Sequence, residues 1–78
     1  MEFPLEYLEM VITAEAWRMV AKNLATIHGL DRGGLYSHYS QARDIVNSIP
    51  LIATLKTSPK VSHEEIIEVL KLSDTLHL

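Results

Sequence analysis

The stretch that decides the fold is Leu24-Ala25-Thr26-Ile27-His28-Gly29-Leu30-Asp31-Arg32-Gly33-Gly34-Leu35-Tyr36-Ser37-His38-Tyr39. Its residue types suit the end of one helix, a three-residue turn and the start of a second helix. Gly29 fits the left-handed position that closes a helix, because glycine has no Cβ to clash there. Asp31 fits the N-cap of the next helix, where its carboxylate accepts hydrogen bonds from backbone N–H groups. The pattern predicts a helix-turn-helix, in which two helices cross steeply.

The run from Gly29 to Tyr39 resembles the helix-turn-helix of the TetR-type transcriptional regulators, and the resemblance covers residues 24–45. In that family a Gly-apolar-Ser/Asp-Lys/Arg-Gly-x-Leu-Tyr-x-His-Phe/Tyr run forms the turn and the recognition helix. The resemblance implies double-stranded DNA as a partner. The residues to which it gives a role at DNA are Lys22, Arg32, Gly33, Gly34, Tyr36, Ser37, His38 and Arg43. Outside residues 24–45 the chain departs from the family, and an ordinary helical hairpin remains the alternative.

The resemblance also divides these roles between bases and phosphates. Arg32 would contact a phosphate or a guanine edge, and Gly34 and Ser37 would face the bases. Tyr36 and His38 would hydrogen-bond phosphate oxygens. Lys22 and Arg43 would contact flanking phosphates.

Two adjacent glycines lie in the expected first turn of the second helix, where glycine destabilises the helix. Each costs on the order of 1 kcal/mol relative to alanine inside a helix. Gly33 and Gly34 would let a phosphodiester backbone approach closely, with the helix N-terminus favouring its charge. The alternative is a flexible connection between two helices.

The composition favours one small folded domain. The chain has 78 residues, of which 47% are hydrophobic, so it has enough apolar side chains for a core. It contains no cysteine, which excludes a disulfide framework, a zinc finger and a thiol nucleophile. The acidic N-terminus differs from a secretory signal, and the longest charge-free run, residues 45–55, is too short to span a membrane. We expect a soluble, cytoplasmic protein without a cofactor and without a membrane partner.

The charges are unevenly distributed. The net charge is −3, yet residues 16–43 have a local balance of +3, and residues 1–15 carry four glutamates and no cation. Phosphate binding responds to the local field more than to the total charge. Because four basic residues per chain are few, useful DNA affinity would need a dimer.

Apolar spacing places the remaining helices. One helix begins at Pro4, and a shift of the apolar face predicts a break or bend near Thr13. A further helix begins near Ser40, and Pro50 forces a kink or a restart. Residues 57–60 form a short linker.

The last helix is expected over about residues 62–77. Ser62 and Glu65 have the spacing of a capping box, and Val61 can pack on Ile66 as a hydrophobic staple. The apolar stripe that follows is wider than one contact requires, which favours a helical partner such as a second copy of the chain. The residues predicted to form this dimer interface are Ile66, Val69, Leu70 and Leu76.

Catalytic and metal sites are not expected. The four histidines lack a short ligand spacing, and His63 with the residues after it fails the His-Glu-x-x-His pattern. Arg32 and His38 have an Arg-x5-His spacing similar to that of HEPN-type ribonucleases, which is a common short pair. We therefore predict that the chain is not an enzyme.

The sequence thus predicts an all-α single domain over residues 1–78, a small bundle of four to five helices with a helix-turn-helix at about residues 14–40. The first hypothesis for its function is a small homodimeric DNA-binding transcriptional regulator. The alternative is an all-helical protein–protein interaction module, an adaptor or an inhibitor, without DNA binding. A break near Thr13 and an exposed Tyr36 would favour the first. An unbroken helix from Pro4 to His28 would favour the second.

Overall fold

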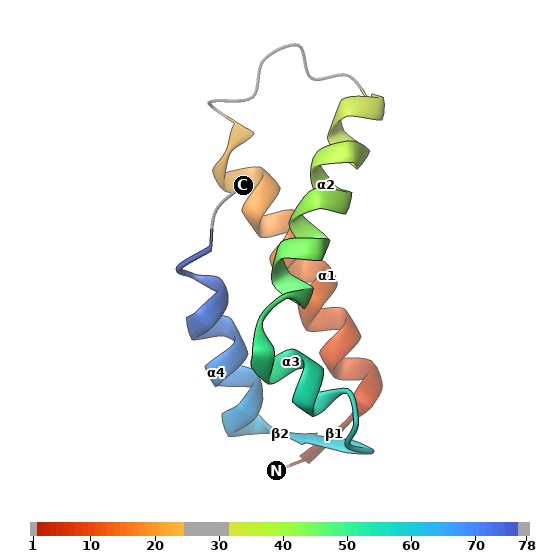
Figure 1. The fold of residues 1–78 in the computed structure, drawn as a ribbon, viewed down its shortest axis with the longest axis vertical. Helices are drawn as coiled ribbons and strands as arrows, with labels where there is room; N and C mark the ends of the chain where they lie inside the picture. The colour runs from red at the N-terminus through yellow and green to blue at the C-terminus, as the bar shows by residue number, and fades with distance from the viewer. Residues whose placement is uncertain (1, 25–31, 77–78) are drawn as a thin grey trace.

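The computed structural model describes residues 2–24 and 32–76, with Arg32 and Gly33 described for the backbone alone. The described chain is mostly helical, as the sequence predicts, and it adds a two-stranded sheet that the sequence did not predict (Figure 1). The elements in order are β1 (Glu2–Pro4), α1 (Leu5–Lys22), α2 (Arg32–Asn47), α3 (Pro50–Leu55), β2 (Lys60–Ser62) and α4 (His63–Ser73).

The first helix, α1, is continuous through Thr13, so the predicted break there is wrong. One face of α1 is buried along its whole length, with Leu8, Ile12, Ala16 and Val20 at four-residue spacing. Thr13 lies beside this face, and its hydroxyl accepts a hydrogen bond from Arg43 on α2 rather than capping a helix. Ala16 and Val20, whose offset suggested a bend, thus lie on the same buried face as Leu8 and Ile12 of one unbroken helix.

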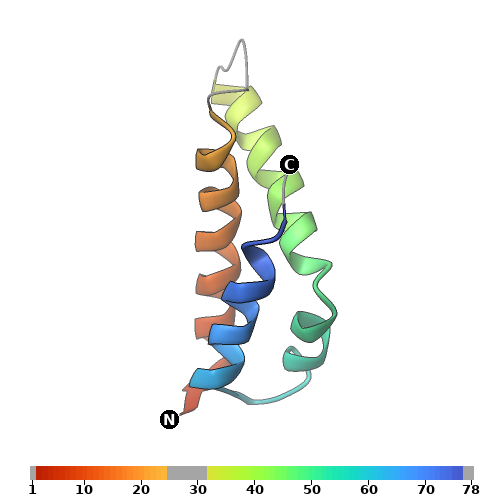
Figure 2. The same ribbon diagram turned by 90° about the vertical axis from the view of Figure 1, so that its left-hand side faces the viewer.

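The helices α1 and α2 lie side by side as an antiparallel pair (Figures 1 and 2). Contacts between them pair early residues of α1 with late residues of α2: Glu9 binds Arg43, whereas Trp17 stacks on Tyr39 and meets Tyr36 edge-on. Their axes cross obliquely in Figure 1, and a helix-turn-helix is not confirmed. The predicted turn at residues 29–31, with Gly29 and Asp31, lies outside the described residues.

The helix α2 extends beyond residue 40, where the helix-turn-helix was predicted to end. It ends shortly before Pro50, where the sequence predicts a kink or a restart. Ser40 is exposed in the middle of α2 and begins no new helix. The α2 helix ends at Asn47, and Pro50 takes the first position of α3, where its missing N–H costs no hydrogen bond. The restart at Pro50 is therefore confirmed.

The start of α4 is fixed by a capping box and by the strand that precedes it. The capping box is confirmed, because Ser62 Oγ accepts from the Glu65 N–H at 3.1 Å and Glu65 Oε1 accepts from the Ser62 N–H at 2.9 Å. Before it, β2 pairs antiparallel with β1, placing Phe3 opposite the fully buried Val61. The α4 helix ends at Ser73, four residues short of the predicted end, so Leu76 follows the helix.

A single hydrophobic core fills the space between α1, α2, α3 and α4. It receives residues from every helix and from β2. Its buried apolar members are Leu8, Ile12, Ala16, Met19, Val20, Ala42, Val46, Ile49, Ile52, Leu55, Val61 and Val69.

Candidate interaction surface

The side of α1 that faces away from the core carries a second row of apolar residues. We call it the outer face of α1 and define it by Tyr7, Met10, Ala14, Trp17 and Ala21. Their spacing alternates between three and four residues, which places them along one stripe of a helix. Figure 2 shows α1 along one edge of the molecule, with α2 and α4 on the same side of it.

The outer face is exposed along most of its length. Met10 is 64% exposed and Tyr7 is 44% exposed, and the side chains of Ala14 and Ala21 also face solvent. A shallow depression, lined almost wholly by apolar atoms, lies between Glu9, Met10, Thr13 and Ala14. Covering such a surface would be favourable by about 25 cal/mol for each Å² of apolar area removed from water.

An aromatic cluster extends the outer face onto α2. Trp17 stacks on Tyr39 with ring centroids 4.2 Å apart, and it meets Tyr36 edge-on at 6.2 Å. Tyr36 is 59% exposed, whereas Trp17 and Tyr39 are half-buried. Because this cluster joins the two helices, the apolar surface continues from Met10 through Trp17 to Tyr36.

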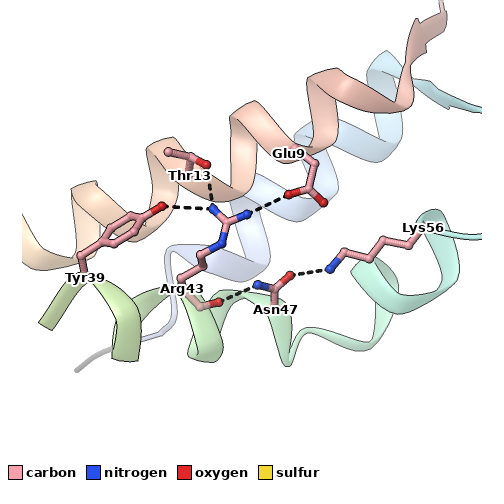
Figure 3. A network of polar contacts seen from close by, with 6 residues as sticks. All are labelled: Glu9, Thr13, Tyr39, Arg43, Asn47 and Lys56. Carbon is pink, nitrogen blue, oxygen red and sulfur yellow. Dashed lines mark hydrogen bonds and ion pairs between the residues drawn. The ribbon is translucent and has the colours of Figure 1, made fainter. Parts of the chain in front are cut away.

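Arg43 fastens α2 to α1 beside the outer face (Figure 3). Its Nη2 donates to Glu9 Oε2 at 2.8 Å, and its Nη1 donates to Thr13 Oγ1 at 2.7 Å and to Tyr39 Oη at 3.1 Å. The guanidinium thus reaches across the helix pair and holds the two polar side chains that border the depression. A cation already paired with a carboxylate has less to offer a phosphate, so the predicted phosphate role of Arg43 loses support.

A second arginine ties α1 to the C-terminal end of α4. Arg18 donates to both carboxylate oxygens of Glu15, at 2.8 and 2.6 Å, and forms an ion pair with Asp74. Glu15 is only 5% exposed, and burying a carboxylate without an ionic or hydrogen-bonding partner would be costly, so the contacts with Arg18 offset that cost. Hydrogen bonds to Glu15 and, to a smaller extent, to Asp74 raise the pKa of Arg18 above its already high ordinary value.

The described residues among those predicted to bind DNA differ in exposure and pairing. Lys22, Tyr36 and Ser37 are exposed, Gly34 and His38 are half-buried, and Arg43 is engaged with Glu9. The side chain of Arg32 and the surroundings of Gly33 lie outside the described residues. Leu35 and Tyr39, from the same run of sequence, pack against the core.

The dimer interface predicted on α4 is not one exposed face. Val69 is fully buried in the chain's own core, so it is not available to a partner, and Ile66 and Leu76 also pack against that core. Leu70 is exposed at 38%, as is its neighbour Ile67. The apolar stripe of the C-terminal segment is wide because most of its residues pack into the chain's own core. Spacing alone does not show which partner an apolar residue has.

The outer face of α1 was missed from the sequence although its signal was present. The three–four spacing from Tyr7 to Ala21 can be read directly from the sequence, but none of the predictions uses it. Periodicity identifies an apolar face and does not say whether the chain itself covers it.

Neither a metal site nor a membrane span is found in residues 2–24 and 32–76. No group of three metal-ligating side chains gathers there, and His28 and His77 lie outside that part. No helix within it is both long and apolar enough to cross a bilayer.

Comparison with known proteins adds no relative: no family model, no curated protein and no solved structure matches the chain. Functional inference therefore rests on the geometry of the described residues.

Proposed function

We propose that this chain is an all-helical protein–protein interaction module that binds a helix of its partner along the outer face of α1. The observation that carries the proposal is Met10, which is 64% exposed within an apolar row on a continuous helix. Soluble proteins rarely leave a contiguous apolar stripe uncovered unless something docks on it. A stripe with three–four spacing suits a second helix, whose side chains insert between its residues.

The surroundings of the outer face suit a docking surface that keeps its shape. The opposite face of α1 is anchored in the core through Leu8 and Ile12. The Arg43 contacts hold Glu9 and Thr13 at one border. A face preorganised in this way loses little conformational entropy when a partner binds. Met10 adds an adaptable thioether chain, which suits a contact with another helix.

DNA binding is the second candidate, and the exposure of Tyr36 and Ser37 on α2 favours it. Both residues belong to the run that resembles the TetR-type recognition helix. Against this candidate stand the unbroken course of α1 through Thr13, the pairing of Arg18 and Arg43 with carboxylates, and the net charge of −3. The observations therefore favour a protein partner.

Two experiments on the full chain separate the candidates. In the first, a photo-crosslinking amino acid replaces Met10, and in a matched control it replaces Leu70 on α4. The interaction module predicts crosslinked protein from the Met10 position, and the same partner should be lost from pull-downs with Met10→Asp and kept with Leu70→Asp. Recovery that is insensitive to Met10→Asp would contradict the proposal.

The second experiment titrates the chain against random duplex DNA at low salt. The interaction module predicts no binding at concentrations of tens of micromolar, a range in which nonspecific DNA-binding domains do bind. Binding that weakens with Arg32→Ala and Tyr36→Ala, and not with Met10→Asp, would establish the DNA hypothesis instead.

A further inference from the structure

We infer that the partner helix is α1 of a second copy of this chain, packed antiparallel with a two-fold axis beside Ala14. This inference rests on the proposed docking function of the outer face and specifies its occupant. A two-fold interface uses the same surface on both copies, so the surface must be complementary to itself. The outer face meets this condition in both shape and charge.

The shape condition follows from the order of large and small side chains. With Ala14 on the axis, each residue lies level with the one that is equally far from Ala14 in the other direction. Tyr7 of one copy then lies level with Ala21 of the other, and Met10 lies near Trp17. A large side chain therefore meets a small one at the ends, and two alanines let the helices approach closely at the centre. A parallel pair would place Tyr7 beside Tyr7 and leave a gap between the two Ala21 residues.

The charge condition points to the same orientation. Glu6 is exposed in the first turn of α1 and Glu2 is exposed just before it in β1, whereas Lys22 is exposed at the end of α1. Glu6 and Lys22 are 16 residues apart, about 24 Å along a helix, which exceeds the screening length of about 8 Å in physiological salt. An antiparallel pair brings the acidic end of each copy to the basic end of the other, and it also opposes the helix dipoles. A parallel pair would bring like charges together.

Single cysteines test the arrangement, because the chain has none of its own. Under mild oxidation Ala14→Cys should give a covalent dimer, since the axis places the two cysteines together. Ala21→Cys is the matched control on the same face. In the antiparallel pair its two copies lie about 21 Å apart along the helices, beyond the roughly 7 Å between Cα atoms that a disulfide spans. An equimolar mixture of Tyr7→Cys and Ala21→Cys should link as a heterodimer.

The pattern of disulfide-linked dimers decides between the antiparallel pair and its alternatives. A dimer from Ala14→Cys alone among the single variants, together with the mixed heterodimer, supports the inference. Dimers from both Ala14→Cys and Ala21→Cys, at equal rates, would indicate a parallel pair or random collision and would overturn it. Circular dichroism of each variant in the reduced state checks that α1 is intact.

Sedimentation equilibrium of the unmodified chain separates this inference from the proposed function. We expect reversible dimerisation between low micromolar and near-millimolar concentration, with Met10→Asp raising the dissociation constant roughly tenfold or more and Leu70→Asp leaving it unchanged. A chain that stays monomeric while the Met10 crosslinker captures a different protein would refute the self-association and retain the docking function. A monomeric chain that captures nothing at Met10 would refute both.

Discussion

The two faces of α1 both have helical apolar spacing but opposite surroundings. The inner face is covered by the chain itself, whereas the outer face is open to solvent except at Trp17, which packs on Tyr39. The inner face carries Leu8, Ile12, Ala16 and Val20, and the outer face carries Tyr7, Met10, Ala14, Trp17 and Ala21. Branched aliphatic side chains dominate the inner face, where they fill fixed space. Tyrosine, methionine and alanine dominate the outer face, and tyrosine and methionine are typical of protein interfaces. The type of residue therefore distinguishes the buried face from the exposed face, whereas helical periodicity alone does not.

The largest expected effect is the loss of stability when a side chain on the inner face of α1 is truncated, compared with a truncation on the outer face. Ile12→Ala should lower the free energy of unfolding by roughly 2–5 kcal/mol, because Ile12 is fully buried and its loss leaves a cavity. Met10→Ala, two residues away, should change it by no more than about 0.5 kcal/mol, since its side chain is largely in water. Urea unfolding at concentrations where the chain is monomeric measures both values. Equal losses would show that the outer face is buried in the folded monomer.

An intermediate effect is expected at the border between α1 and α4. Arg18→Met should lower the free energy of unfolding by roughly 1–2 kcal/mol, because Glu15 would keep a buried carboxylate without its main partner, and the exposure of Arg18 limits the loss. Glu15→Gln in the Arg18→Met background should recover part of it, since the amide carries no charge. Failure of that recovery would indicate that Arg18 contributes through packing of its stem alone.

The smallest effect is expected at the border between α1 and α2. Arg43→Met should cost about 1 kcal/mol or less, because the Glu9–Arg43 pair is partly solvated and screened. A double-mutant cycle with Glu9→Gln, repeated at low and high salt, isolates the ion pair. Its coupling energy should shrink as salt increases, and a coupling that is independent of salt would contradict a mainly electrostatic contact.

The sequence predicted the elements whose signals are local. The capping box of Ser62 and Glu65 and the restart at Pro50 both depend on residues within one helical turn. Their geometry follows from backbone groups that must be satisfied at a helix end, so no tertiary context can easily override them.

The features that the sequence did not predict depend on distant partners. Val69 belongs to the core because α4 docks on α1, and Arg43 is paired because Glu9 lies 34 positions earlier on the neighbouring helix. The pairing of β1 with β2 joins three-residue strands that carry no strand signal of their own. The continuity of α1 was missed because Ala16 and Val20 were assigned to a different face from Leu8 and Ile12, whereas all four line one buried face of the helix.

The small sheet has a consequence for the order in which the chain assembles. Phe3 and Val61 are 58 positions apart, so bringing them together closes nearly the whole polypeptide into one loop. The length-dependent part of that closure costs about 3.6 kcal/mol when it is made from the open chain. Once α1 and α2 have packed, the remaining gap is far shorter. The strand pair and the docking of α4 should therefore form late in folding and open first under stress, ahead of the paired helices.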